Sequence, residues 1–450
     1  MATLRIAEWS SSLKYTDLPP AVVDAALRSF YNWLGCALGG SNHPTTTTAI
    51  KALSPFFGKE TSSILGGSAR ADASHAALIN GIASHVHDYD DTHLETIIHP
   101  TGPVASAVLA YAEKLASEGR SVSGEDFLIA LVVGIEAECK IGLSVWPKHY
   151  DIGWHITSST GSIGAAVATS KLLSLNPSQT AHAIGIACTQ VTGLREMFGT
   201  DTKSFHVGRS AQNGLLAAIL ASQGFTSSTI ALEAKRGWVN VVGQGVNRLD
   251  EFVGSLGKVW EIEKNAFKPF PCGIVVHPVI DGCIQLHKDI KAQGLGVKDI
   301  KAVKCKVHPL VLELTGKKTP QDGLQAKFSV YHGGAVGLVL GKAGPAQYAD
   351  EVVTSQEITS VRDKIDATAD EKLGADEAEI VVEFQDGKQL KKHVEHAIGS
   401  LEVPITNEQL EEKFLDQVSL VLGQEGAKKA SETAWGLKGA GDVAALVKAL

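Results

Sequence analysis

The chain has 450 residues, of which 44% are hydrophobic and 20% are charged, a globular composition that excludes global disorder. At about 150 residues per domain, this length predicts two or three domains. The formal charge of −8, from 41 basic and 49 acidic residues, argues against a nucleic-acid partner, which would require a strongly basic face.

Membrane insertion and secretion are also disfavoured. No run of about 18 apolar residues is free of charges and glycine breaks, so we expect no transmembrane helix. The N-terminal segment lacks the apolar region of a secretory signal. The six cysteines form no CxxC pair, and a chain of this length needs no disulfides. The sequence therefore predicts a reduced, cytoplasmic protein without a membrane partner.

Residues 20–266 follow a helical pattern almost throughout. Apolar residues recur at helical spacing from Ala21 to Leu34, and this segment ends at a glycine pair. Similar segments follow at 76–86, 103–115, 127–141, 162–173, 181–187 and 207–223. The pairs Gly161/Ala165 and Gly164/Ala168 let helix backbones approach closely, which indicates buried helices. Residues 1–266 are therefore predicted to form the first part of a large all-helical domain.

The pattern changes after residue 266. Residues 301–314 are β-branched and partly alternating, which predicts a strand. Residues 379–384 and 388–394 flank Asp386-Gly387 as the strands of a hairpin would. Helices are expected at 276–291, 329–340 and 359–367. Residues 267–400 are therefore predicted to form a smaller α+β domain.

Residues 401–450 return to a helical pattern, at 407–422 and 440–450. If these terminal helices rejoin the first ones, the α+β domain is an insertion. The predicted fold is mainly α, with a large helical domain completed by the C-terminus and a smaller α+β domain inserted in it.

The densest group of titratable side chains lies in residues 81–100. It comprises His85, His87, His93, His99, Asp88, Asp90 and Asp91. Such groups beside an apolar helix are unfavourable unless they are paired or functional. Three interpretations stay open: a metal site, a solvated helix end, and an acid–base and anion-binding loop. Residues two apart on a helix face different directions, so His85 and His87 do not easily share one ion.

Two further segments have residues suited to bind an anion. His155 precedes a helix whose N-terminus is rich in Ser and Thr, where free N–H groups and hydroxyls favour a carboxylate. This histidine is either a general acid or base or a structural residue. Lys203 lies just before the apolar helix expected at 207–223. It could bind an anion or act as a base of lowered pKa. Alternatively, its side chain extends along the surface to solvent.

The junction between the two predicted domains contains Lys268, Cys272 and His277, and junctions are common small-molecule sites. Cys272 is a candidate nucleophile, although a lone cysteine is more often a packing residue. Tyr331 and His332 begin another helix. The sequence has no P-loop, GxGxxG fingerprint, GxSxG elbow or HExxH motif, so no nucleotide cofactor is indicated.

Five segments, taken in order, resemble the MmgE/PrpD family of 2-methylcitrate dehydratases and cis-aconitate decarboxylases. They are HDYDDTHLETIIHPTGP (87–103), GWHITSSTG (153–161), GTDTKSFHVGRSAQNG (199–214), KPFPCGIVVHPVIDG (268–282) and QAKFSVYHGG (325–334). The resemblance covers nearly the whole chain. It implies a helical domain completed by the C-terminus, an inserted α+β lid, and a homodimer.

The resemblance also implies the chemistry. The expected function is that of a lyase, without metal or organic cofactor, that acts on a small di- or tricarboxylate by proton abstraction next to a carboxylate. The product arises by dehydration of the 2-methylcitrate type or decarboxylation of the cis-aconitate type. The alternative is an epimerase of an amino-dicarboxylate such as iminodisuccinate, and a metal-dependent hydrolase is less favoured.

Matching the family motifs assigns roles to nine residues. The catalytic set is Asp88, His99, His155, Lys203 and His277, and the substrate-binding set is Thr92, Lys268, Tyr331 and His332. Lysine and histidine cations would stabilise negative charge that develops next to a carboxylate, without a metal. The carboxylate of Asp88 would orient or charge a histidine.

Overall fold

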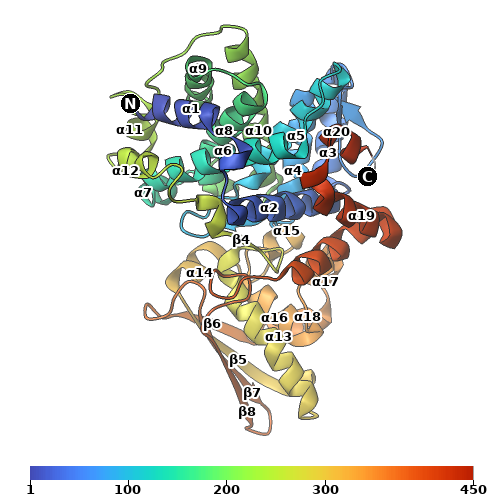
Figure 1. Cartoon of the computed structure of the whole chain (residues 1–450). Coiled ribbons are helices and arrows are strands. Elements are labelled where there is room, and N and C mark those ends of the chain that lie inside the picture. The colour runs from blue at the N-terminus through green and yellow to red at the C-terminus, as the bar shows by residue number, and fades with distance from the viewer. Residues whose placement is uncertain (449–450) are drawn as a thin grey trace. The chain divides into compact units, whose positions relative to one another are not determined.

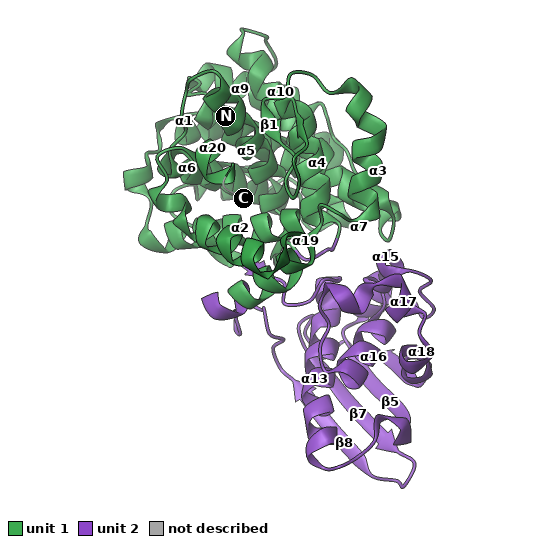
Figure 2. Ribbon diagram, turned by 90° about the vertical axis from the view of Figure 1, so that its right-hand side faces the viewer, with its two compact units in different colours: residues 1–86, 90–265, 411–450 green, residues 87–89, 266–410 purple. Residues whose placement is uncertain are grey.

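The structure is a computed structural model that describes residues 1–448. Its contacts divide the chain into two compact units, coloured green and purple in Figure 2. Unit 1 comprises residues 1–86, 90–265 and 411–448, and unit 2 comprises residues 87–89 and 266–410. The mainly α fold class is confirmed.

Unit 1 is built almost entirely of helices (Figure 1). They are α1 Ala2–Ser12, α2 Pro20–Gly39, α3 Pro44–Leu53, α4 Ala73–His85, α5 Thr101–Ser117, α6 Gly124–Val145, α7 Lys148–Asp151, α8 Ile156–Leu172, α9 Pro177–Cys188, α10 Asp201–Ser222, α11 Trp238–Val242, α12 Leu249–Gly254, most of α19 Asn407–Trp435, and α20 Val443–Val447. The short strands are β1 Ser62–Ser63, β2 Arg70–Ala71, β3 Asp91–His93 and β4 Asn265–Phe267, the last of which begins in unit 1. Each of the seven helices predicted between residues 20 and 223 is present.

Helices α4, α8 and α10 pack at very short range, because their contacts are made through glycines. Helix α10 lies against both α4 and α8, and α8 also packs on α6. A Cβ added to Gly81 of α4 would lie 2.5 Å from the Cα of Gly208 in α10. A Cβ on Gly214 would lie 2.5 Å from that of Ala165 in α8. The backbones are therefore in direct contact, as the small-residue pairs in the sequence indicate.

Unit 2 contains a four-stranded sheet with helices packed on it. The strands are β5 Ile300–Val307, β6 Ile365–Ala369, β7 Ala378–Phe384 and β8 Gln389–Val394, in the order β6-β5-β7-β8. Strand β6 is parallel to β5, whereas β7 is antiparallel to β5 and β8. The helices are α13 His277–Ala292, α14 Pro309–Thr315, α15 Gly323–Ala326, α16 Val330–Leu340, α17 Asp350–Val353 and α18 Gln356–Arg362. Helices α13 and α16 pack on each other and on the sheet, and the predicted hairpin is confirmed.

Two predicted elements of unit 2 are wrong in part. The strand expected at 301–314 ends at Val307, because Pro309 has no N–H for the sheet and instead begins α14. The helix expected at 359–367 ends at Arg362, and Ile365–Ala369 forms β6. The backbone of β5 accepts this parallel partner at its edge, so tertiary pairing overrides the helical pattern.

The two chain ends also differ from the sequence prediction. Helix α1 is not among the predicted helices. The helix expected at 407–422 continues as α19 to Trp435, interrupted at Gly423, whose φ of 69° is not helical. Of the helix expected at 440–450, residues Val443–Val447 form α20, and residues 449–450 lie outside the described part of the chain.

The six cysteines are all buried and free. Burial raises the pKa of Cys36, Cys272 and Cys305 to about 12, and it raises the pKa of the other three thiols as well. All six are therefore protonated at neutral pH, so Cys272 does not act as a nucleophilic thiolate.

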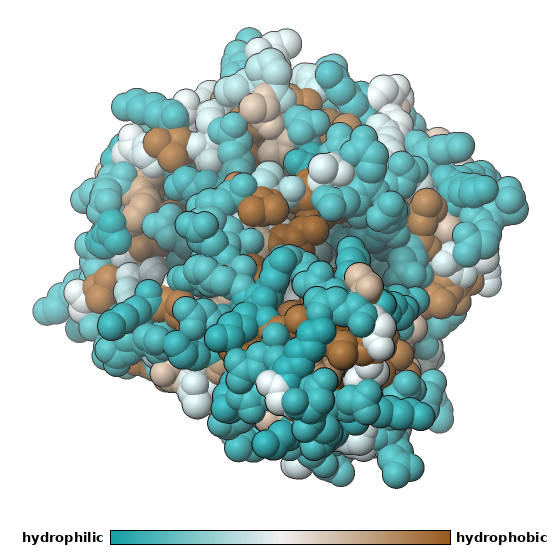
Figure 3. Space-filling view, turned by 90° about the horizontal axis from the view of Figure 1, so that it is seen from below, coloured by the Kyte–Doolittle hydropathy of each residue, from teal (hydrophilic) through white to brown (hydrophobic). Residues whose placement is uncertain are grey.

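The face of the molecule in Figure 3 is mostly hydrophilic, with hydrophobic side chains in small scattered groups. Within residues 1–448, every helix falls short of the length and apolar character needed to cross a membrane.

The glycine contacts give a direct test of the packing. A Cβ at position 208 would overlap the backbone oxygen of Leu78, so Gly208→Ala should lower the free energy of unfolding by about 1–3 kcal/mol. Urea denaturation measures this change. Gly436→Ala is the control, because an added Cβ there meets no atom within 4 Å. Equal stability of the two variants would show that α4 and α10 are not in contact at this point.

Candidate active site

The nine residues that the family resemblance implies are distributed over both units. Unit 1 contains Thr92, His99, His155 and Lys203, and unit 2 contains Asp88, Lys268, His277, Tyr331 and His332. The structure therefore defines two groups, and each is described within its own unit.

His155 and Lys203 lie at the N-terminal ends of two long helices of unit 1. His155 is the N-cap residue of α8, and its backbone N–H donates to the carbonyl of Gly193 at 3.0 Å. Lys203 is the third residue of α10, so the prediction that it precedes the helix is wrong, and the helix begins six residues before the expected start at 207. The helix begins at Asp201, following the extended Thr200. Both side chains are therefore at helix ends where the dipole favours negative charge.

Four histidines of unit 1 form a buried group, which we call the histidine cluster. Its members are His85, His99, His155 and His206. The ring centroids of His85 and His99 are 4.8 Å apart, and those of His155 and His206 are 5.3 Å apart. His155 lies 6.0 Å from His85 and 6.4 Å from His99, again between centroids. The cluster combines the end of α4, the loop before α5, and the starts of α8 and α10.

The carboxylate of Asp90, which is fully buried, holds two members of the cluster. Its Oδ2 accepts a hydrogen bond from Nδ1 of His85 at 2.7 Å, and its Oδ1 lies 3.7 Å from Nδ1 of His99. Nδ1 of His99 also donates to the backbone carbonyl of Asp91 at 2.8 Å. Because a carbonyl only accepts, the hydrogen is on Nδ1, and the lone pair of the neutral His99 ring is on Nε2. Asp90 and this carbonyl thus fix the orientation of two imidazoles.

Burial keeps two histidines of the cluster uncharged. It lowers the pKa of His155 well below 6.5, and the positive charge of Lys203 acts in the same direction. Burial also lowers the pKa of His206 to about 4. The Nζ of Lys203 lies 5.2 Å from the ring centroid of Phe198, which in turn is 5.1 Å from the ring of His155. Unit 1 therefore places a neutral imidazole, able to accept a proton, near a lysine.

The loop that carries His99 is fixed by Asp91. Its Oδ2 accepts hydrogen bonds from the Thr101 hydroxyl and the Asn265 amide, each at 2.5 Å. Burial and the nearby charge of Asp90 raise the pKa of Asp91 to about 6. Thr92, the neighbouring residue, has its hydroxyl 3.3 Å from Nδ1 of His99. Thr92 therefore contacts His99, a member of the histidine cluster.

In unit 2, the carboxylate of Asp88 binds a lysine. The Nζ of Lys268 donates to Oδ1 of Asp88 at 2.7 Å and to its backbone carbonyl at 3.1 Å. Lys327 donates to the carbonyl of His87 at 2.8 Å, and the Tyr89 hydroxyl donates to that of Pro269 at 3.0 Å. These bonds explain why residues 87–89 belong to unit 2. The resemblance implies that Asp88 acts on a histidine, whereas in its own unit Asp88 pairs with Lys268.

His277 begins α13, as the sequence predicts. It is buried, and its ring meets that of Phe270 edge-on, with centroids 5.4 Å apart. The position matches that of His155 in unit 1, because both histidines lie at the start of a long helix.

Tyr331 and His332 lie in the core of unit 2. The ring of Tyr331 is among the buried residues of this core, with the Lys318 Nζ 5.5 Å from its centroid. His332 is fully buried, its Nε2 donates to the carbonyl of Gln347 at 3.0 Å, and burial lowers its pKa to about 4. The carbonyl of Gln347 thus fixes the orientation of the His332 ring within the core of unit 2.

Three rings of the histidine cluster could hold a metal ion. His85, His99 and His155 each offer one nitrogen, and these atoms lie within 4.8 Å of one another. Imidazole nitrogens are common ligands of zinc and other transition metals.

The sequence interpretation did not select His85, Asp90 or His206 as site residues. The first two belong to the titratable segment 81–100, so a signal for them was present. His206 lies one turn after Lys203 on α10, and this spacing places both on the same side of the helix. Only the three-dimensional contact with His155 identifies it.

The chain matches the model of the MmgE/PrpD N-terminal domain over residues 4–248 and that of the MmgE/PrpD C-terminal domain over residues 270–438. It therefore belongs to the MmgE/PrpD family.

The relatives that the chain resembles are named for one of two activities. The cis-aconitate decarboxylase-like protein oryM of Aspergillus oryzae is 28% identical over 99% of this chain and 96% of its own. The cis-aconitate decarboxylase of Homo sapiens is 26% identical over 91% of this chain and 86% of its own. The 2-methylcitrate dehydratase of Salmonella typhimurium is 26% identical over 53% of this chain and 52% of its own. Both activities are lyase activities, and together with the family match they make the chain an enzyme of the lyase class.

The contacts of Asp90 predict that it positions the histidine cluster. Asp90→Asn keeps the shape but removes the charge that binds His85, so kcat should fall by about 10- to 100-fold, as for other residues that orient a functional imidazole. Steady-state kinetics as a function of pH measures the effect, and the pH profile should shift together with kcat.

The control is Glu113→Gln. Glu113 is also buried and accepts two hydrogen bonds from Ser63, but it lies outside the histidine cluster. This variant should change stability and leave the pH profile unaltered. A normal pH profile in Asp90→Asn, with loss of stability alone, would assign Asp90 a structural role.

Proposed function

We propose that the chain is a lyase that decarboxylates a small tricarboxylate of the cis-aconitate type, without metal or organic cofactor. The observation that carries this proposal is the neutral, buried His155 next to Lys203, at the N-terminal ends of α8 and α10. This combination supplies a proton acceptor and a cation in a region poor in water. The cation stabilises negative charge that develops on carbon in decarboxylation and in dehydration, and the proton acceptor serves the reactions in which a C–H proton is removed.

The extent of the similarity favours decarboxylation. The relatives named as cis-aconitate decarboxylases align over 91% or more of this chain, whereas the 2-methylcitrate dehydratases align over 53%. Dehydration remains the second candidate, supported by that partial match.

The chemistry of decarboxylation suits these residues. The bond between carbon and one carboxylate breaks, CO2 leaves, and the electron pair stays on a conjugated carbon skeleton that still carries carboxylates. A carboxylate is already anionic and accepts further charge poorly, so the ammonium of Lys203 stabilises the developing charge. The ammonium of Lys203 is the proposed donor of the one proton that is then added to carbon. In dehydration, a neutral imidazole removes the proton next to a carboxylate, the ammonium of Lys203 donates a proton to the hydroxyl oxygen, and the C–O bond breaks to release water.

The roles of the remaining residues are part of the proposal. His99 presents Nε2 as its basic atom, and Asp90 holds its ring. Lys268 and His277 of unit 2 are proposed to bind substrate carboxylates, as the family resemblance implies. Asp88 would hold the ammonium of Lys268 in position, since the two side chains form an ion pair with an N–O distance of 2.7 Å.

We also propose a homodimer. Helix α10 exposes Phe205, Leu216 and Leu220, which lie on one face of the helix at these spacings. An exposed apolar stripe of this kind supports an interface with a second copy.

Product analysis tests the proposed reaction. The purified chain is incubated with cis-aconitate, 2-methylcitrate and other di- and tricarboxylates, and products are read by mass spectrometry. Loss of one CO2 from cis-aconitate is expected, with and without the chelator dipicolinate. Loss of water from 2-methylcitrate would favour the second candidate. Solvent-deuterium exchange without loss of mass would favour an epimerase, and activity abolished by chelation would favour the metal-binding interpretation of His85, His99 and His155.

Substitutions test the two central residues. His155→Ala removes a proton-transfer group and should lower kcat by about 10²–10⁴-fold. Lys203→Ala should raise KM and lower kcat, because one cation serves both substrate binding and charge stabilisation. Lys203→Arg should restore activity only in part, since a planar guanidinium does not replace a compact ammonium.

Thermal unfolding provides the control for these variants. Lys203 is a buried cation, so its removal ends the cost of desolvating an ammonium, and the melting temperature should change little or rise. Lys429→Ala, at an exposed position of α19, should leave both kinetics and stability unchanged. Variants of His155 or Lys203 that unfold at much lower temperature but retain normal kcat while folded would overturn the assignment.

A further inference from the structure

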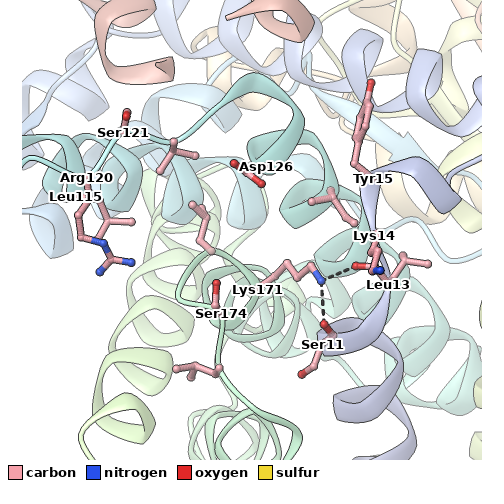
Figure 4. Close-up of a pocket in the computed structure, with 14 residues that line it drawn as sticks. Ser11, Leu13, Lys14, Tyr15, Leu115, Arg120, Ser121, Asp126, Lys171 and Ser174 are labelled. Carbon is pink, nitrogen blue, oxygen red and sulfur yellow. Dashed lines mark hydrogen bonds between the residues drawn. The ribbon is translucent and has the colours of Figure 1, made fainter. Parts of the chain in front are cut away.

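Unit 1 contains a cavity of about 490 Å³ that the proposed function does not use (Figure 4). It is lined by the end of α1, the connection between α5 and α6, the start of α6, and the end of α8. Its volume lies in the range of small-molecule sites, about 300–1,000 Å³, and exceeds the requirement of a single inorganic ion.

The lining of this cavity is basic, although the chain as a whole has a formal charge of −8. Lys14, Arg120 and Lys171 line it together with a single carboxylate, Asp126. Figure 4 shows Arg120 on one side of the cavity and Lys14 and Lys171 on the other. The cations are therefore separated, so they suit a ligand with at least two anionic groups.

Lys171 is held in a fixed position. Its Nζ donates to the carbonyls of Ser11 at 3.1 Å and Leu13 at 2.5 Å, where α1 ends. These two bonds leave the third N–H of the ammonium for another acceptor. Burial lowers the pKa of Lys171, although Asp126 opposes the shift. A positioned, partly desolvated ammonium interacts more strongly with an anion than a solvated one does.

The rest of the lining combines hydroxyls with apolar side chains. Ser11, Ser121 and Ser174 contribute hydroxyls. Ser174 lies just after the end of α8 in the left-handed conformation, with a φ of 54°, and the N–H of Leu175 donates to the carbonyl of Ser170 at 3.0 Å. The apolar part consists of Leu115, Val122, Ile129, Leu172 and Leu175. Such a surface suits a carbon skeleton better than a bare inorganic anion.

We propose that this cavity binds a small organic polyanion with at least two carboxylate or phosphate groups on a short carbon chain. The site is distinct from the histidine cluster. His155 caps one end of α8 and Lys171 lies in the last turn at the other, which places them about 24 Å apart along the helix at 1.5 Å per residue. The proposal does not depend on which reaction the histidine cluster performs.

Calorimetric titration at low ionic strength tests the proposal. The probes are propane-1,2,3-tricarboxylate and 2-phosphoglycerate, which distinguish a carboxylate ligand from a phosphate ligand, with sulfate as the inorganic comparison. Titrations use the full-length Lys203→Ala variant, in which anion binding near His155 is weakened. At least one organic probe is expected to bind once per chain, and sulfate more weakly.

Arg120→Glu in the same background identifies the site. Arg120 is exposed, so the fold should be retained. Loss of a charge-assisted contact should weaken binding by about 10- to 100-fold. The matched control is Lys51→Glu, which makes the same charge change at an exposed position outside the cavity. Equal binding in the Arg120→Glu and Lys51→Glu variants, no binding of either organic probe, or sulfate bound as tightly as both would overturn the proposal.

Discussion

The direct backbone contact between helices α4, α8 and α10 is the constraint on which the histidine cluster depends. Gly81 meets Gly208, and Gly214 meets Ala165, so none of the three helices can slide along another without collision. Each helix carries a residue of the candidate site at or near its end: His85 is the last residue of α4, His155 is the N-cap of α8, and Lys203 lies in the first turn of α10. Rigid packing in the helix middles therefore sets the distances between groups at the helix ends.

Desolvation is the dominant electrostatic effect in both units. In unit 1 it disfavours the charged form of His155, and nearby positive groups add to this effect, so His155 is neutral. The carboxylate of Asp90 is equally buried but is bound by imidazole. In unit 2 the buried charges of Lys268 and Asp88 offset each other, because the two side chains form an ion pair. Buried charge is thus retained in both units with a specific partner.

The helices of the chain could be predicted from sequence because their apolar and small residues recur at helical spacing, and the hairpin was marked by Asp386-Gly387. Strand β6 could not be predicted in this way, because it is stabilised by pairing with β5, which is far away in the sequence. The positions of His155 and His277 at helix starts were also predictable. The sequence could not show that Asp88 pairs with a lysine and Asp90 with a histidine. These partners depend on the turn of the backbone at Asp88, where φ is 50°.

The burial of all six thiols makes the chain a convenient host for spectroscopic labels. Because each native cysteine is inaccessible and protonated at neutral pH, a maleimide reagent should react selectively with one cysteine introduced at the surface. Pairs of such labels, one in each unit, would measure by fluorescence energy transfer the distance between the two units with and without substrate. No native cysteine would first have to be replaced.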